Sequence, residues 1–183
     1  MDSFDFGAAV RQSTTARPGR SAQPVCADLP LFDFEADYAK SLCCMPMIVR
    51  YKLDACRIKL SLQHWQRFDL ATRRLLIMTE GVDGPGEQRR YRHLLIHAIV
   101  HQAKAQPVKM PARQTDTDWD GALLPERVHR SALDKGITLN GFRSWADLGA
   151  LQRFTLFKLT RPGHENRNFR LALEEFDLCL PRG

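Results

Sequence analysis

The sequence predicts an all-α protein built from two tandem, related helix-turn-helix units, at about residues 46–76 and 125–156, joined by a central helix. Three observations lead to this prediction. The first unit is echoed by the second at an offset of 80 residues over most of its length. Apolar residues recur at helical spacing in several segments, and almost none shows the alternation typical of a strand. An echo at fixed spacing indicates one supersecondary unit used twice, each copy burying its apolar face partly against the other.

The evidence for the repeat is a set of single residues that are identical in the two units. Two tryptophans stand in register, and we expect them to anchor the cores of their units. We expect Arg73 and Arg153 either to pair with Asp54 and Asp134 or to cap a neighbouring helix end. The residues that recur unchanged are Arg50, Leu53, Asp54, Trp65, Arg73 and Leu76, which return as Arg130, Leu133, Asp134, Trp145, Arg153 and Leu156, while Ile48 and Phe68 return as Val128 and Leu148.

The first unit follows a polar beginning. Residues 1–30 are rich in Ser, Thr, Ala, Gly and Pro and predict a flexible tail, and residues 31–183 predict a single all-α domain with an internal duplication. A helix is predicted over Glu35–Cys43. Pro46 suits the first turn of the next helix, Met47 to about Cys56, because its missing N–H costs nothing there. Ser61 and Asp69 are predicted N-caps of the two helices that complete the unit.

The second unit repeats this order, with Asn140 in the capping role and a last helix over Leu151–Leu159. Gly136 is predicted to end the preceding helix in a left-handed conformation, where the first unit has Arg57. Between the units, 87–106 predicts a helix with Tyr91 on its buried side, and 107–121 a surface loop. A final helix is predicted over Asn168–Phe176, with its apolar residues Phe169, Ala172, Leu173 and Phe176 facing inward.

Composition is typical of a soluble globular protein. The 183 residues are 44% hydrophobic and 26% charged, and no apolar run approaches the roughly 20 residues that cross a bilayer. Asp2 and Asp5 stand where a secretory signal carries positive charge. Five cysteines without CxxC spacing fit reduced thiols. We therefore expect a cytoplasmic protein without a membrane segment, whose cysteines serve mainly in packing.

A net charge of +6 permits an anionic partner without selecting one. The basic residues are scattered in short clusters, such as Arg73–Arg74 and Arg89–Arg90, which are typical of solvated helix faces. Because the sequence lacks a concentrated basic helix, we expect nucleic acid not to be the partner.

Three histidines form the most specific candidate for a metal site in the sequence. His93, His97 and His101 recur every four residues, a spacing that can place two imidazoles on one metal ion. Arg90 and Lys104 share their sector of the helix, and no Asp or Glu completes a metalloenzyme motif. We therefore interpret them as a solvent-facing stripe.

No catalytic motif is present. His164 and Glu165 can act as an acid and base pair in a loop, although no nucleophile or oxyanion motif accompanies them, and loop capping is the favoured interpretation. The sequence has no GxSxG motif, phosphate loop or pair of CxxC motifs. We expect no catalytic residue, no cofactor and no metal site, and hence a protein that is not an enzyme.

The stretch FDFEADYAKSLCCMPMIVRYKLDACRIKLSLQHW, from Phe32 to Trp65, closely resembles the signature of the nitrate reductase-associated protein family. The family's C-terminal half is similar to two later segments of this sequence, QRFTLFKLTRPGHENRNF and ALEEF. The resemblance therefore covers most of residues 31–178. The most specific portion is MPMIVRYKLD, at 45–54. The family pattern has a glycine where this sequence has Arg57.

The resemblance implies a small cytoplasmic protein encoded alongside assimilatory nitrate reductase and molybdenum-cofactor functions, which assists the reductase's activity or maturation. It implies no catalytic residues. Candidate partner-contact residues within the matching segments are Arg50, Tyr51, Lys52 and Asp54, with His164, Glu165 and Asn166 in the late loop. Internal pairing or capping is the alternative for each.

Three functional hypotheses follow. The leading one is a non-catalytic accessory or assembly protein that binds nitrate reductase or its molybdenum-cofactor maturation machinery, for cofactor insertion or electron delivery. The second is a nucleic-acid-binding regulator, since paired short helices and a basic charge permit it. The third is a metal-dependent enzyme that uses the histidine stripe.

Overall fold

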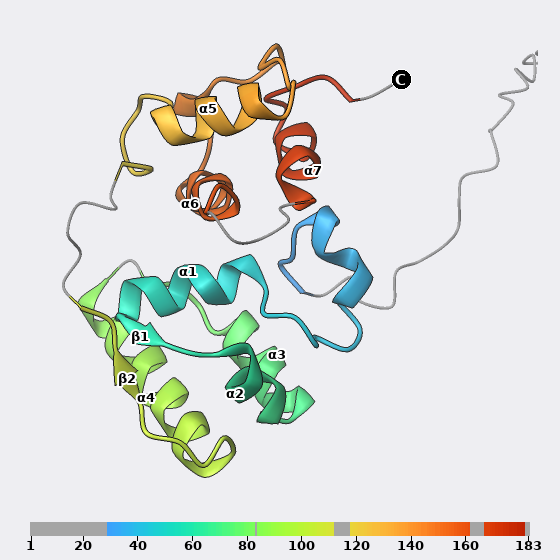
Figure 1. The fold of residues 1–183 in the computed structure, drawn as a ribbon. Helices are drawn as coiled ribbons and strands as arrows, with labels where there is room; N and C mark the ends of the chain where they lie inside the picture. Colours follow the sequence, from blue (N-terminus) through green and yellow to red (C-terminus); the bar gives the residue numbers. More distant parts are fainter. Residues whose placement is uncertain (1–28, 83, 112–117, 162–166, 182–183) are drawn as a thin grey trace, which may run out of the picture.

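Helices form most of the structure, a computed structural model that describes residues 29–82, 84–111, 118–161 and 167–181. The predicted all-α class is confirmed at this level, with one two-stranded sheet added (Figure 1). In chain order the elements are η1 (Asp33–Tyr38), α1 (Met47–Cys56), β1 (Ile58–Lys59), α2 (Leu62–Arg67), α3 (Leu70–Met78), α4 (Pro85–His101), β2 (Val108–Lys109), α5 (Glu126–Asp134), η2 (Trp145–Asp147), α6 (Ala150–Leu159) and α7 (Asn168–Glu175).

Helix α1 lies in the middle of the molecule, in contact with both α4 and α6 (Figure 1). Its predicted bounds are confirmed. Pro46 is its N-cap, and Arg57 ends it in the left-handed region, at φ 57° and ψ 42°. Val49, Leu53 and Cys56 are buried along the predicted stripe. Because one helix packs against elements from both halves of the chain, α1 is the element that joins them.

The buried apolar residues form two clusters rather than one. The N-terminal cluster is built around α1 to α4, and its largest fully buried side chains are Trp65, Phe68 and Tyr91. The C-terminal cluster is built around α5 to α7 and contains Trp145, Phe154, Phe169 and Phe176. Tyr51 of α1 packs against both clusters. The single domain over 31–183 stays a prediction. Of the predicted tail, residues 1–28 lie outside the described ranges, and Leu29 packs against the N-terminal cluster.

The first and last elements lie against each other. The backbone N–H groups of Asp33 and Phe34 donate to the two carboxylate oxygens of Glu175, over 2.9 and 3.2 Å. The rings of Phe32 and Phe34 lie 4.9 and 6.4 Å from that of Phe176. η1 therefore packs on the C-terminal cluster although it precedes the N-terminal cluster in the chain (Figure 1).

Several predicted bounds need correction. The helix predicted over 35–43 is a shorter 3-10 helix, and Leu42 has φ of 48°, which interrupts helical geometry. The helix predicted over 87–106 begins at Pro85 and ends at His101. Part of the predicted loop 107–121 is strand β2, which pairs antiparallel with β1 through Ile58 with Lys109 and Lys59 with Val108.

Helix caps follow the predictions with one exception. Ser61 Oγ accepts from His64 N at 3.1 Å, Asp69 Oδ1 accepts from Thr72 N at 2.6 Å, and Gly136 has φ of +61°. Asn140 was the wrong N-cap, because Ser144 precedes η2 and donates its backbone N–H and its hydroxyl to Asp147 Oδ2. The backbone around Asn140 is held elsewhere, since Gly141 N donates to Leu178 O. A Cβ at Gly141 would lie 1.9 Å from Asp177 O, so only glycine fits this approach.

Within the described ranges, no helix is both long enough and apolar enough to cross a membrane.

Candidate functional site

The four candidate contact residues on α1 have different surroundings. Arg50 is exposed, and its Nε donates to Met45 O at 3.1 Å. Tyr51 is half-buried between the two clusters, with its ring centroid 5.3 Å from Phe154 and 6.1 Å from Trp119. Trp119 is itself 7% exposed. The sequence predicts a surface loop here, because the DTDWDG segment is typical of a turn. The large apolar surface of Trp119 was the feature that could have indicated its burial.

Lys52 is buried, with 4% of its surface exposed. Its Nζ donates to three backbone carbonyls at the C-terminal end of α3, those of Ile77 at 2.8 Å, Thr79 at 2.6 Å and Leu76 at 3.4 Å. A cation there also meets the negative end of the helix dipole. Burial opposes the charged form and lowers the pKa of Lys52 to about 8. The burial of Lys52 could have been inferred from helical spacing. The lysine lies on the same stripe of α1 as the apolar residues Val49, Leu53 and Cys56.

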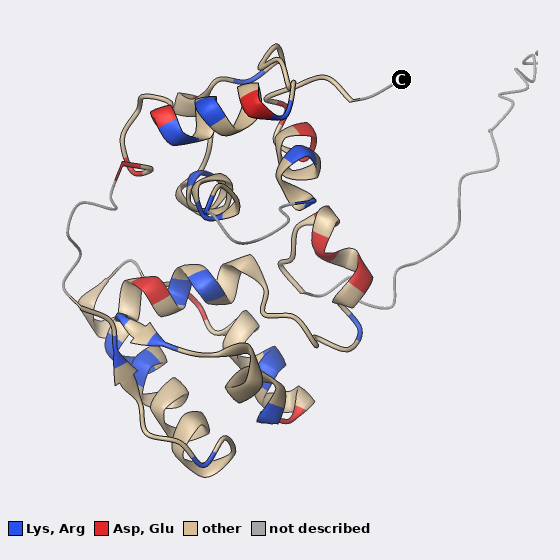
Figure 2. Cartoon of the chain, viewed as in Figure 1, with Lys and Arg blue, Asp and Glu red and all other residues tan. Residues whose placement is uncertain are grey.

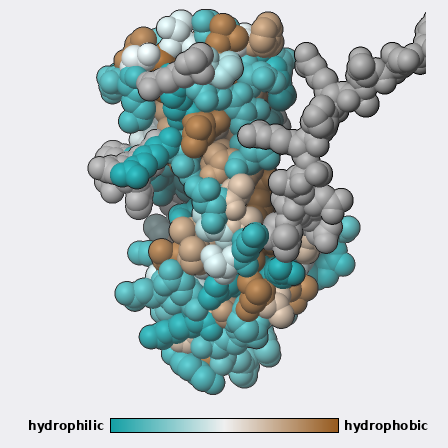
Figure 3. Space-filling model, turned by 90° about the vertical axis from the view of Figure 1, so that its right-hand side faces the viewer, coloured by the Kyte–Doolittle hydropathy of each residue, from teal (hydrophilic) through white to brown (hydrophobic). Residues whose placement is uncertain are grey.

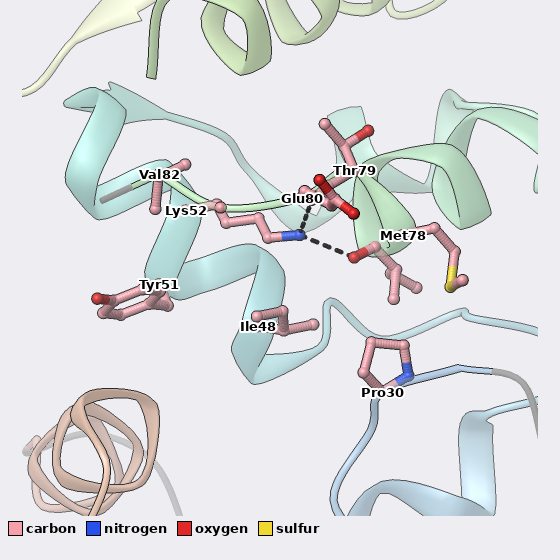
Figure 4. A pocket seen from close by; sticks show the side chains of 10 residues that line it. Pro30, Ile48, Tyr51, Lys52, Met78, Thr79, Glu80 and Val82 are labelled. Carbon is pink, nitrogen blue, oxygen red and sulfur yellow. Dashed lines mark hydrogen bonds between the residues drawn. The ribbon is translucent and has the colours of Figure 1, made fainter. Parts of the chain in front are cut away.

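A pocket of about 220 Å³ adjoins Lys52 (Figure 4). In Figure 4 the Lys52 ammonium is directed to the backbone at the end of α3, with Ile48 and Tyr51 nearby on α1. Because all three N–H donors of this ammonium are used, Lys52 acts here as a cap of α3. The residues lining the pocket are Pro30, Ile48, Tyr51, Lys52, Ile77, Met78, Thr79, Glu80, Gly81 and Val82.

Asp54 joins α1 to the other half of the chain. Its Oδ1 accepts from Lys158 Nζ of α6 at 2.9 Å, and the two side chains are only 12% and 15% exposed. The Lys158 ammonium also lies 4.9 Å from the centre of the Phe154 ring. Such a partly buried pair is screened less than a surface pair. It fixes α1 against α6 across 104 residues of sequence.

Glu35 is a buried carboxylate of η1 that lies next to the beginning of α1, and the sequence does not mark it as a candidate. It is 1% exposed and accepts from Tyr38 Oη at 2.6 Å, Met47 N at 2.8 Å and Phe32 N at 3.3 Å. Burial raises the pKa of Glu35, and the hydrogen bonds with the charge of Arg50 act in the opposite direction. Since the Met47 N–H is one of the unpaired donors of the first helical turn, Glu35 caps α1 from a distance.

The two tryptophans make matching contacts. Trp65 Nε1 donates to Leu42 O at 2.7 Å, and Arg73 Nη1 donates to the same oxygen at 3.3 Å. Trp145 Nε1 and Arg153 Nη1 donate to Gly121 O, at 3.0 and 3.1 Å. Each arginine also reaches the preceding carbonyl, that of Ser41 or Asp120. Both arginines thus hold backbone rather than pair with Asp54 or Asp134. We call each Trp–Arg pair with its two carbonyls a carbonyl clamp.

The three histidines of α4 are all exposed. The rings of His97 and His101 lie 4.3 Å apart. In the described part of the chain, no three His, Cys, Asp or Glu side chains are grouped so as to hold a metal ion. The loop candidates His164, Glu165 and Asn166 fall outside the described residues.

Surface charge is mixed. Figure 2 shows Lys and Arg on helices of both halves, with acidic residues between them. The face in Figure 3 is mainly hydrophilic and carries small groups of hydrophobic side chains. In the described ranges, the most exposed large apolar side chains are Leu123 and Phe142, at 84% and 90%.

The protein is mostly helical, and its helix α1 joins two hydrophobic clusters. The polar side chains Lys52 and Asp54 of α1 bond to neighbouring elements. The model of a family described as conserved nitrate reductase-associated protein matches residues 31–176. The chain therefore belongs to the nitrate reductase-associated protein family. No curated protein and no solved structure gave a significant match.

Proposed function

We propose that the protein is a cytoplasmic, non-catalytic accessory factor that supports assimilatory nitrate reductase activity or maturation through protein–protein contacts. The family match over residues 31–176 carries this proposal. The use of Lys52, Asp54 and Glu35 within the chain supports it, because these charged groups, which are largely shielded from solvent, are engaged with neighbouring elements.

The partner is nitrate reductase or its molybdenum-cofactor maturation machinery. A net charge of +6 suits contact with an acidic protein, since charge complementarity raises association rates and selects partners. Of the candidate contact residues on α1, Arg50 is the exposed one and Tyr51, Lys52 and Asp54 are half-buried or buried. We therefore place Arg50 in the docking surface, together with the predicted loop residues His164, Glu165 and Asn166.

The test is deletion and complementation in nitrate-grown cells. Deletion should lower nitrate reductase activity while reductase transcript stays normal, and the tagged full-length protein should co-purify with the reductase or a maturation protein. Arg50→Ala should reduce co-purification. Arg130→Ala is the matched control, because Arg130 is an exposed arginine on α5 that pairs with Glu126 of the same helix. Unchanged reductase activity after deletion would exclude the proposal.

We also infer that the two halves descend from one duplicated unit. Elements α1, α2 and α3 correspond in order to α5, η2 and α6, and α3 begins 80 residues before α6. The two carbonyl clamps support the inference further, since an indole and a guanidinium share one carbonyl oxygen in each half. A left-handed residue also follows each first helix, Arg57 directly after α1 and Gly136 one residue further after α5.

A further inference from the structure

Cys43 and Cys44 are adjacent exposed thiols in the segment that joins η1 to α1. The other described cysteines, Cys56 and Cys179, are buried. As neighbours in the chain, the thiols of Cys43 and Cys44 also influence each other's ionisation. Two soft sulfur ligands therefore stand side by side on the surface, where packing does not account for them.

The backbone that carries the pair is held by side chains of α2 and α3. Trp65 and Arg73 hold the carbonyls of Ser41 and Leu42 in the first carbonyl clamp, and Gln66 Nε2 donates to Cys43 O at 3.0 Å. Cys43 N donates to Ser41 Oγ at 3.3 Å. Because the segment is fixed on both sides of Leu42, the two sulfurs are presented from an ordered backbone.

The second carbonyl clamp shows that this backbone does not require cysteine. There the clamped residues are Asp120 and Gly121, and the next two are Ala122 and Leu123. Alanine and leucine thus follow the same clamp in the C-terminal half. The pair of cysteines therefore occurs after the first clamp and not after the second. This difference favours a role in ligand binding rather than in folding.

Charge around the pair favours an anionic complex. Two neighbouring thiolates repel each other, so ionising both is costly without a cation between them. A monovalent ion on two thiolates leaves one net negative charge, and the cations of Arg50 and Arg73 lie on this side of the chain to offset it.

We propose that Cys43 and Cys44 form a two-thiolate site for a soft monovalent metal ion of the Cu(I) class. Thiolates select Cu(I), whereas structural Zn(II) takes four ligands, and no third His, Cys, Asp or Glu joins these sulfurs among the described residues. Binding forms two metal–sulfur bonds, breaks two S–H bonds and releases two protons to solvent, with no change of oxidation state.

The test is an anaerobic titration of the full-length reduced protein with Cu(I), in competition with the chromophoric chelator bicinchoninate. We expect one Cu(I) per chain to be withdrawn from the chelator. Cys43→Ser and Cys44→Ser should each weaken binding by more than the roughly 10- to 100-fold that loss of an outer-shell partner costs. Circular dichroism of each variant should match the wild type, because both side chains are exposed.

Matched controls separate the pair from the other thiols. Cys26→Ser, Cys56→Ala and Cys179→Ala should each keep the wild-type Cu(I) affinity, and Zn(II) at the same concentration should not displace Cu(I). Wild-type binding by a Cys43→Ser/Cys44→Ser double variant, or the absence of Cu(I) uptake by the wild type, would overturn the proposal.

Discussion

Lys52 couples the stability of the fold to pH. Its folded-state pKa of about 8 lies below the ordinary value of 10.5, so the unfolded chain holds this proton more tightly than the folded protein. The burial penalty is complete below pH 8 and is relieved as pH rises toward 10.5. The free energy of unfolding of the wild type, measured relative to Lys52→Met, should therefore increase over that interval, by at most about 3 kcal/mol.

Urea denaturation of both proteins at several pH values between 7 and 10.5 measures this difference. Because the two proteins share every other titrating group, those groups cancel in the comparison. A difference that stays constant across the interval would show that the three carbonyls compensate the burial of the charge completely.

Arg57 occupies a backbone position that suits glycine. At φ 57° and ψ 42°, a side chain crowds the backbone, and glycine does not. Arg57→Gly should raise the free energy of unfolding by about 0.5–1 kcal/mol. Gly136→Ala, after α5 and with φ of +61°, should lower it by about 1 kcal/mol. Thermal denaturation of both variants checks the two signs, and a destabilised Arg57→Gly variant would contradict this reading of the α1 cap.

At the scale of elements, the two carbonyl clamps should contribute comparably to stability. Arg73→Ala and Arg153→Ala each remove a guanidinium from two carbonyls, one of which also accepts an indole N–H. Each should lower the free energy of unfolding by about 1.5–3 kcal/mol, the usual range for hydrogen bonds from a charged group. Arg74→Ala is the control, because Arg74 is an exposed neighbour on α3, and it should change stability by less than about 0.5 kcal/mol. A large loss for only one clamp would argue against equivalent halves.

Local signals predicted the elements that depend on local physics. Pro46 and the stripe through Val49 and Leu53 placed α1, and Ser61 and Asp69 placed the caps of α2 and α3. Elements shaped by distant partners were missed. β2 forms because Val108 and Lys109 pair with β1, from which α4 separates them in the sequence. A strand of two residues is too short to show an alternating pattern.

At the scale of the whole molecule, the Asp54–Lys158 pair links the halves. A double-mutant cycle with Asp54→Asn and Lys158→Met should give a coupling energy of about 1–3 kcal/mol, because the pair is mostly shielded from solvent. Glu126 and Arg130, an exposed pair within α5, should give about 0.3–0.5 kcal/mol as the control. Coupling across α1 and α6 no larger than that of the control would show that apolar packing alone holds the halves together.

The candidate site could be predicted only in outline. The signature residues of α1 were identified from the sequence, but the fate of each side chain depends on elements far away: Lys52 on the end of α3, Asp54 on α6, and Tyr51 on Trp119 and Phe154. Lysine and aspartate are ordinarily exposed, so composition favours a surface role for both. Their burial follows from two clusters meeting at α1, which a repeat in the sequence does not reveal.

The contact of Asp33 and Phe34 with Glu175 has a consequence for synthesis on the ribosome. Glu175, the partner of η1, is translated 142 residues after Asp33, so the nascent chain can complete α1 to α4 before α7 is available to η1. η1 can dock only after α7 has left the exit tunnel. A stop codon placed before Glu175 would therefore leave Phe32 and Phe34 exposed on an otherwise folded N-terminal half, a natural target for chaperones.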